Sequence, residues 1–238
     1  MNSRTRLFGS FVCVAALLGC GVALAQDKKP AEKPAAEKPA AKPADVKAAD
    51  PKAGAKAGEK AVAGMPSPEE MKKWMEAATP GEAHAKLKPM AGKWTFVTKW
   101  RMAADQPWSE STGKAEFKWI MGDRFLVQDI KGNPDPSMGG MSFEGHGMMG
   151  YDNVSKKYYS TWADNMGTGI MTSTGTIDGS GKTITYSGEY NDPMTGQNKT
   201  AKSVTKIEGD DKFVFQMFDK APDGKEFSNL EVTYTRAK

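Results

Sequence analysis

Apolar and polar side chains alternate along most of the chain from Gly92 onward. In the first such run, Trp94 and Phe96 fall on one face, and Lys93 falls on the other. Because successive side chains of a strand point to opposite faces, this pattern predicts strands with one buried face. The predicted strands are 93–102, 109–120, 124–131, 141–151, 157–165, 168–177, 182–190, 198–207, 212–219 and 227–236.

Turn-forming residues separate many of these strands, and no helical pattern lies between them. The turns include Asp152-Asn153, Gly179-Ser180-Gly181 and Asp223-Gly224. A meander of ten short strands closes on itself or splits into two layers, and closure removes exposed strand edges. We therefore predict an all-β domain over residues 92–238, a closed antiparallel up-and-down β-barrel of about ten strands.

Two short helices are predicted over residues 65–91, before the barrel. Ser67-Pro68-Glu69-Glu70 and Thr79-Pro80-Gly81-Glu82 are both helix-start signals, and Pro89 ends the second segment. Apolar positions of the first helix recur at helical spacing: Met71, Trp74, Met75 and Ala78. We expect this stripe to pack on the barrel; the alternative is that Trp74 contacts a partner or a membrane surface.

The amino terminus has the pattern of a secretory signal peptide over residues 1–25. A short basic region precedes the apolar run 7–18, and Ala23-Leu24-Ala25 offers a cleavage site. Leu17-Leu18-Gly19-Cys20 also resembles the bacterial lipoprotein box, which would anchor the protein through a lipid on Cys20. The expected location is periplasmic or secreted, and a membrane-anchored lipoprotein is the alternative.

Residues 26–64 are almost entirely Lys, Ala, Pro, Glu and Asp. Such a composition buries too little apolar surface to offset its ordering entropy, so a disordered linker is expected. Both cysteines, Cys13 and Cys20, precede it. The remainder of the chain therefore has no disulfide and no cysteine nucleophile.

Charge and hydropathy exclude two further classes of partner. The chain has a net charge of +4, but residues 82–238 hold 20 Lys and Arg against 20 Asp and Glu. No basic stripe emerges there, which argues against nucleic acid. Beyond the leader, no stretch is apolar enough to span a bilayer. The oligomeric state stays open.

Gly92-Lys93-Trp94 resembles the Gly-x-Trp signature of calycins, the superfamily of lipocalins and fatty-acid-binding proteins. That resemblance implies an arginine from the last strand packed over the tryptophan. Here Arg236 is in phase with Leu230, Val232 and Tyr234, so alternation turns it toward the core. A core-facing guanidinium needs a partner, and an indole face supplies one.

Several further motifs together resemble a bacterial family of unknown function, DUF1579, over about residues 82–237. They include Ala91-Gly92-Lys93-Trp94, Gly122-Asp123-Arg124-Phe125-Leu126, Gly150-Tyr151-Asp152-Asn153, Ser160-Thr161-Trp162 and Thr233-Tyr234-Thr235-Arg236. The resemblance implies a calycin-like barrel but no activity. His146 lies outside the family's pattern.

A barrel of this size can hold a small apolar or amphipathic ligand or fill itself with its aromatic side chains. Alternation predicts the residues that would line such a site: Trp100, Trp119, Tyr151, Trp162, Asp164 and Tyr186. Asp164 would be a polar anchor in an apolar cavity. The alternative for Asp164 is a structural bond to the turn at Asn165 to Gly167.

His146 and nearby methionines suggest a soft-metal site as a second kind of chemistry. His146 with Met148, or with Met138, Met166 or Met171, could hold Cu(I). The alternative is that His146 is an exposed strand residue and the methionines fill the core. Haem ligation by His84 or His146 is a further alternative, but the sequence indicates no cofactor.

No catalytic constellation emerges from the sequence. No serine has the glycine pattern of a nucleophile elbow, and most aspartates lie in turns. Three hypotheses follow: an exported, non-enzymatic barrel that binds a small ligand, a structural or interaction domain of the cell envelope without a ligand, and a periplasmic Cu(I)-binding protein.

Overall fold

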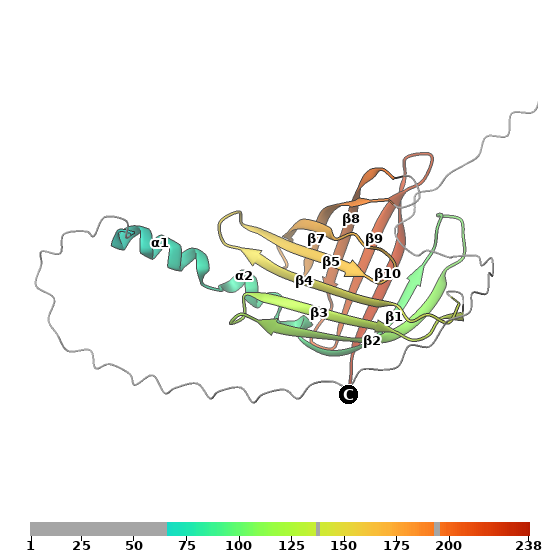
Figure 1. The fold of residues 1–238 in the computed structure, drawn as a ribbon, viewed down its shortest axis with the longest axis horizontal. Coiled ribbons are helices and arrows are strands. Elements are labelled where there is room, and N and C mark those ends of the chain that lie inside the picture. The colour runs from blue at the N-terminus through green and yellow to red at the C-terminus, as the bar shows by residue number, and fades with distance from the viewer. Residues whose placement is uncertain (1–65, 137–138, 193–195) are drawn as a thin grey trace, which may run out of the picture. The chain divides into compact units, whose positions relative to one another are not determined.

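The computed structural model describes residues 66–136, 139–192 and 196–238. Ten antiparallel strands form a closed barrel in these residues (Figure 1). The predicted fold class is therefore confirmed. The predicted signal peptide, the linker, Cys20 and Met138 lie outside the described residues.

Three short helical segments precede the strands: α1 (Pro68–Ala78), α2 (Glu82–Ala85) and the 3-10 helix η1 (Lys88–Met90). The strands are β1 (Gly92–Trp100), β2 (Ser109–Ile120), β3 (Phe125–Gly132), β4 (Glu144–Asp152), β5 (Lys157–Asp164), β6 (Met171–Ile177), β7 (Thr183–Asn191), β8 (Asn198–Ile207), β9 (Lys212–Lys220) and β10 (Glu226–Arg236). Each strand pairs with its neighbours in the chain, and β1 pairs with β10 to close the barrel.

The fourth strand begins three residues later than the alternation predicts. Met141, the first residue of the predicted strand, is 49% exposed and forms an isolated bridge with Asp135. The Asn165 side chain accepts a hydrogen bond from the Glu144 N–H and donates one to the Ser142 carbonyl. The segment before Glu144 is therefore held as a loop by local bonds.

The interior next to α2 and η1 is a packed aromatic core. The Phe213 ring stacks on Tyr234 with centroids 4.3 Å apart and meets the edges of Trp94 and Phe117 at 4.8 and 5.4 Å. From the helical segments, Leu87 is fully buried and packs in the same cluster. Offset and edge-to-face contacts of this kind add to the free energy gained by burial. We call this part of the barrel the helix-end half.

The expectation that α1 packs on the barrel is wrong. No α1 residue is buried, and Trp74 and Met75 are 65% and 59% exposed. The contact that α1 does make is polar and lies at its C-terminal end. The Asn153 amide, in the β4–β5 hairpin, donates to the carbonyls of Ala77 at 3.0 Å and Thr79 at 2.8 Å. An amphipathic stripe indicates a helix, but it does not indicate that a neighbour exists.

The second helix also begins differently from the prediction. Thr79 belongs to the end of α1, because its hydroxyl donates to the Met75 carbonyl at 2.6 Å. Gly81 is the N-cap of α2. The expected helix is thus divided into the single turn of α2 and the 3-10 turn that contains Pro89. Within the described residues, no helix is long and apolar enough to cross a membrane.

Candidate functional site

Arg236 and Trp94 meet at the helix end of the seam between β1 and β10. The guanidinium carbon lies 4.2 Å from the centre of the indole ring. Gly92 makes this approach possible, because a Cβ there would lie 2.6 Å from Arg236 Nη1, and its backbone φ is +121°. The sequence signature Gly-x-Trp therefore has a steric cause in this protein.

Backbone carbonyls accept hydrogen bonds from all three guanidinium nitrogens of Arg236. Nη1 donates to Ala91 at 3.0 Å, Nη2 donates to Pro89 at 2.8 Å, and Nε donates to Asp210 at 2.6 Å. The side chain thus joins β10 to the segment before β1 and to the β8–β9 turn. We call Gly92, Trp94 and Arg236 the latch. All three guanidinium nitrogens of Arg236 are therefore used in structural hydrogen bonds.

Polar bonds also close the helix end. The Tyr158 hydroxyl donates to the Ala83 carbonyl at 2.9 Å, and burial, helped by Tyr151 and Glu82, raises the pKa of Tyr158 to about 12. His84 is buried, and its Nδ1 accepts the Gly81 N–H at 3.1 Å. A further hydrogen bond joins His84 to the Tyr151 backbone. Both histidine contacts are structural, which leaves haem ligation by His84 without support.

The opposite end of the barrel, which we call the far half, has a different inner face. Inward positions in this half include five glycines: Gly113, Gly132, Gly145, Gly147 and Gly188. A Cβ on Gly145 would lie 2.3 Å from the Trp162 ring, and one on Gly147 would lie 2.5 Å from Gln128 Nε2. The Trp162 and Gln128 side chains therefore lie close against the wall beside these glycines.

Solvent reaches the inner face of the far half. Three large side chains there have the inward phase of their strands but are only half-buried and lie outside the aromatic core cluster: Trp100, Trp162 and Met171. In the helix-end half, by contrast, Trp94 and Phe117 are 1% and 2% exposed. Partial exposure of an inward side chain means that this end of the barrel is not sealed by packing.

Four hydroxyl groups lie together on the inner wall of β6, β7 and β8. Tyr186 pairs with Ser203, Thr205 is two residues further along β8, and Ser173 pairs with Gly188 two residues further along β7. Directly opposed side chains on one face of a sheet lie about 5 Å apart. We call Ser173, Tyr186, Ser203 and Thr205 the hydroxyl belt. Tyr186 is also a member of the aromatic core cluster, so the belt borders that core.

The belt is buried but lacks protein hydrogen bonds. Its four residues are 4–7% exposed. Among the described residues, no protein group forms a hydrogen bond with these hydroxyls. Their oxygens are not among the fully buried side-chain atoms that lack a partner, so these hydroxyls keep some accessible surface. Burial also raises the pKa of the Tyr186 hydroxyl above its ordinary value, so this hydroxyl stays neutral.

Asn229 adds an unpaired acceptor to the same half. It lies in the bulge of β10 between Ser228 and Leu230 and is 8% exposed. In the part of the chain that the structure describes, its Oδ1 is the buried side-chain atom without a hydrogen-bond partner. Such an atom requires an explanation, for example a group that binds there.

The structure divides the six predicted lining residues between the two halves. All six have the inward phase, but Trp119 and Tyr151 pack against the aromatic core, and Tyr151 meets Tyr158 at 4.9 Å. Tyr186 belongs to the belt. The far half contains the other three: Trp100, Trp162 and Asp164.

Asp164 is occupied by local bonds. Its Oδ2 accepts the Trp162 indole N–H at 2.8 Å, and its Oδ1 accepts the Met166 N–H at 3.0 Å. Asp164 therefore bonds to the turn that follows it, as the structural alternative predicted. Its carboxylate also orients the Trp162 indole. Phe143 stacks against that indole at 6.2 Å with an angle of 17° between the rings.

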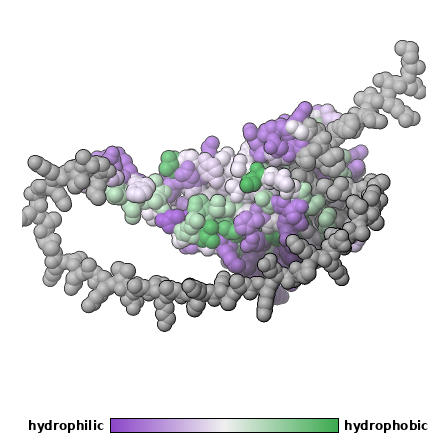
Figure 2. All heavy atoms as spheres, viewed as in Figure 1, coloured by the Kyte–Doolittle hydropathy of each residue, from purple (hydrophilic) through white to green (hydrophobic). Residues whose placement is uncertain are grey.

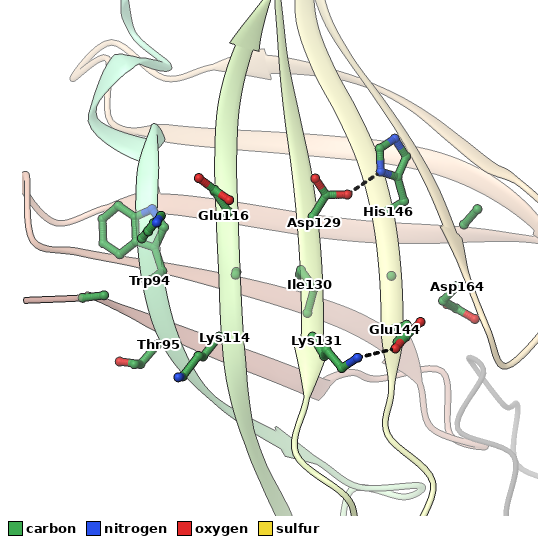
Figure 3. Close-up of a pocket in the computed structure, with 15 residues that line it drawn as sticks. Trp94, Thr95, Lys114, Glu116, Asp129, Ile130, Lys131, Glu144, His146 and Asp164 are labelled. Atoms are coloured by element: carbon green, nitrogen blue, oxygen red, sulfur yellow. Dashed lines mark hydrogen bonds and ion pairs between the residues drawn. The ribbon is translucent and has the colours of Figure 1, made fainter. Parts of the chain in front are cut away.

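A hollow lies on the outside of the barrel, over β1 to β5 (Figure 3). Its polar lining includes two pairs of charged groups on the outward faces of the strands. Lys131 contacts Glu144 at 2.9 Å, and His146 Nδ1 lies 2.7 Å from Asp129 Oδ1. Exposed pairs of this kind contribute about 0–1 kcal/mol each. This hollow is an ordinary solvated face of a sheet.

The residues of the predicted copper site lie in different parts of the barrel wall. Met148 shares the outward face of β4 with His146, but Met171 has the inward phase of β6, on the other side of the wall. Met166 lies in the loop after β5. Among the described residues, no group of three or more His, Cys, Asp or Glu side chains could hold a metal ion.

Ser173, Ser203, Thr205 and Asn229 are the residues that sequence reasoning missed. Serines and threonines at inward positions are visible in the alternation, but a hydroxyl in a strand commonly bonds to nearby backbone. Only coordinates show that these hydroxyls lack such bonds and share one wall. Asn229 is hidden further, because the bulge shifts the phase of β10.

The fold and the latch define a class of protein, a ten-stranded calycin-like barrel. The chain belongs to the family described as "Protein of unknown function (DUF1579)", whose model matches residues 79–236. The resemblance found in the sequence is thus confirmed. No curated protein matches the chain.

Three solved structures are similar to this chain at low sequence identity. The structure titled Rv2717c from M. tuberculosis is 15% identical, with a TM-score of 0.49, over 67% of this chain and 100% of that one. A redesigned β-barrel, b11L5F_LGL, is 17% identical, with a TM-score of 0.34, over 66% of this chain and 96% of that one. EF1p2_mFAP2b bound to DFHBI is 14% identical, with a TM-score of 0.35, over 66% and 100%.

Proposed function

We propose that this protein is an exported, non-enzymatic barrel that binds a small amphipathic molecule inside its far half. The observation that carries the proposal is the hydroxyl belt, four largely buried residues whose hydroxyls have no protein hydrogen bond among the described residues. A ligand that enters from the far end would place its polar group on the belt and its apolar part against Trp162 and Met171.

The two inner surfaces are complementary to such a molecule. Ligand sites are typically apolar walls with a few well-placed polar groups. Here the walls supply Trp162, Phe143 and Leu230, and the belt supplies hydroxyls that can both donate and accept. The helix-end half closes the other end of the barrel, so the ligand has one entrance.

Export rests on the leader sequence and its cleavage site. The non-enzymatic assignment rests on the structural contacts that three ionisable side chains make. Asp164 holds an indole and a turn, His84 joins α2 to β4, and Arg236 holds three carbonyls. Each has a structural reason for its position.

A plugged variant tests the proposal. Ala201 is 5% exposed and faces the interior of the far half on β8, and its neighbour Thr200 faces outward. Binding of the neutral fluorescent dye N-phenyl-1-naphthylamine would be measured for the wild type, for Ala201→Phe and for the control Thr200→Phe. We expect Ala201→Phe to weaken binding at least tenfold and Thr200→Phe to leave it unchanged.

Thermal unfolding of the same variants distinguishes a hollow from a filled interior. If the far half has room, Ala201→Phe unfolds close to the wild-type temperature. If the interior is filled, the added ring overpacks it and costs about 1–3 kcal/mol. A dye affinity that is equal in all three proteins, or absent in all, contradicts the proposal.

A second candidate function is an interaction domain of the cell envelope without a small ligand. The exposed apolar stripe of α1 favours this alternative, because Met71, Trp74 and Met75 remain uncovered. The face of the barrel drawn in Figure 2 mixes hydrophilic and hydrophobic residues. Retention of a lipid-like mass in native mass spectra of the protein from its own host favours ligand binding, and a bare polypeptide favours this alternative.

A further inference from the structure

We infer that the ligand's polar group is uncharged, so the barrel selects alcohols and other neutral amphiphiles over carboxylates of the same chain length. This inference rests on the proposed function and concerns the same site. It follows from the state of every ionisable side chain that has the inward phase.

The belt itself is neutral. Hydroxyls of Ser173, Ser203 and Thr205 do not ionise at physiological pH, and burial raises the pKa of Tyr186 further above its ordinary value. Each hydroxyl can donate one hydrogen bond and accept others. The belt therefore offers hydrogen bonds but no charge.

Inward charges lie at the two ends of the barrel and already have partners. At the helix end, the guanidinium of Arg236 donates to three backbone carbonyls. At the far end, Lys199 pairs with Asp192, which is fully buried. Asp219, also at the far end, accepts the N–H of Lys220 at 2.7 Å. Among the described residues, no inward cation remains beside the belt.

Arg101, at the open end of the far half, also donates its hydrogen bonds to backbone carbonyls. Its Nε donates to the Ser228 carbonyl at 3.0 Å and its Nη1 donates to the Ala104 carbonyl at 2.8 Å. The guanidinium also covers the Trp108 ring at 4.4 Å. These contacts fasten the β1–β2 loop to β10 and hold the cation at the rim.

A carboxylate placed on the belt would thus be buried without a counter-charge. Burying an unpaired charge is far more costly than burying a hydroxyl that keeps its hydrogen bonds. An ammonium group would be disfavoured for the same reason. A neutral head group loses little, because belt hydroxyls replace its bonds to water.

Asn229 indicates which kind of neutral ligand would bind best. Its Oδ1 is an acceptor that lacks a donor, on a strand two places from Ser203 in the sheet. Strands are about 4.8 Å apart, so this acceptor lies on the order of 10 Å along the wall from the belt. A ligand with a second donor would reach both, which favours hydroxylated amphiphiles such as diols over simple esters.

Competition with four probes of one chain length tests the inference. Decan-1-ol, methyl decanoate, decanoate and decylammonium would each displace the neutral dye from the full-length protein at pH 7.5. We expect the alcohol to compete best, the ester next, and both ions at least tenfold more weakly than the alcohol.

Paired variants locate the head group. Tyr186→Phe and Ser203→Ala remove belt hydroxyls, and Tyr159→Phe and Ser187→Ala remove hydroxyls that face outward on β5 and β7. We expect the belt variants to weaken decan-1-ol at least threefold and to narrow its advantage over decanoate. The outward variants should bind all four probes as the wild type does.

The outcomes separate this inference from the proposed function. If the dye binds inside but decanoate competes as well as the alcohol, or better, the inference is overturned and the binding proposal stands. If belt variants change nothing while Ala201→Phe abolishes binding, the ligand binds without the belt, and the inference is also overturned. If no probe and no dye binds, the proposed function itself fails.

Discussion

The helix-end half and the far half of the barrel are built from the same ten strands, yet their interiors differ in kind. In the helix-end half, large aromatic rings pack against each other, and the polar atoms of Trp94 and Tyr158 find backbone carbonyls at 2.8 and 2.9 Å. In the far half, glycines and hydroxyls occupy the inner face, and the large side chains stay half-buried. One half is therefore a packed core, and the other is the half in which we propose that a ligand binds.

This division has a physical consequence for how the protein tolerates change. Stability that arises from close packing is lost when a ring is removed, because the cavity left behind does not collapse fully. A half that is already partly exposed loses less, because its side chains contribute fewer buried contacts. Mutations in the far half should therefore affect binding more than stability.

The largest expected difference is between two apolar truncations. Phe213→Ala removes the ring at the centre of the aromatic core and should cost about 3–5 kcal/mol. Met171→Ala, at a half-buried position of the far half, should cost about 1 kcal/mol or less. Chemical denaturation of both variants measures the difference. Equal losses would contradict the distinction between the halves.

The latch should have the next largest effect. Arg236→Ala removes the cation over Trp94 and leaves three carbonyls without their donors, so we expect a loss of about 2–4 kcal/mol. Arg236→Lys should recover less than half of it, because one ammonium cannot reproduce the planar arrangement of donors. Denaturation midpoints check both variants, and Lys131→Ala, an exposed cation, serves as control.

The smallest expected effect is on the pH dependence of the free energy of unfolding. We expect His84, and not His146, to contribute to it. Burial lowers the pKa of His84 in the folded protein, and a nearby Arg124 charge acts in the same direction. The unfolded chain, with an ordinary pKa of about 6.5, then binds a proton more readily than the folded one. The stabilisation that comes from neutral, buried His84 is fully present above pH 6.5. It is lost as the pH falls through the pKa of His84 in the folded protein.

Replacement of each histidine tests this assignment. Unfolding temperatures measured between pH 7.5 and pH 5 should fall less steeply in His84→Gln than in the wild type. His146→Gln, in which the exposed histidine beside Asp129 is removed, should keep the wild-type slope. An unchanged slope in His84→Gln would refute the role given to His84.

Much of the fold follows from local patterns in the sequence. Alternation indicates ten strands and turns Arg236 toward the core, and the resemblance to calycins implies its contact with Trp94, which the structure confirms. Alternation assigns a side chain to a face, however, and not to a height within the barrel. Trp119 and Trp162 therefore look equivalent in the sequence, although one packs on the aromatic core and the other lies in the far half.

Other features depend on contacts that no local pattern records. The exposed stripe of α1 has the spacing of a buried one, and the bond from Asn153 that holds this helix joins residues 74 positions or more apart. The belt is similar, because each hydroxyl is ordinary by itself. The belt is recognisable only from the structure, which shows that none of its hydroxyls has a protein hydrogen-bond partner among the described residues.

Locating a bound ligand tests the central claim most directly. A crystal structure of the protein soaked with 10-bromodecan-1-ol would place the bromine by its anomalous signal. The account predicts one site in the far half, with the bromine toward the mouth and the hydroxyl within hydrogen-bond distance of Tyr186 or Ser203. Bromine found only on the outer hollow or along α1, with the far half filled by protein side chains, would contradict it.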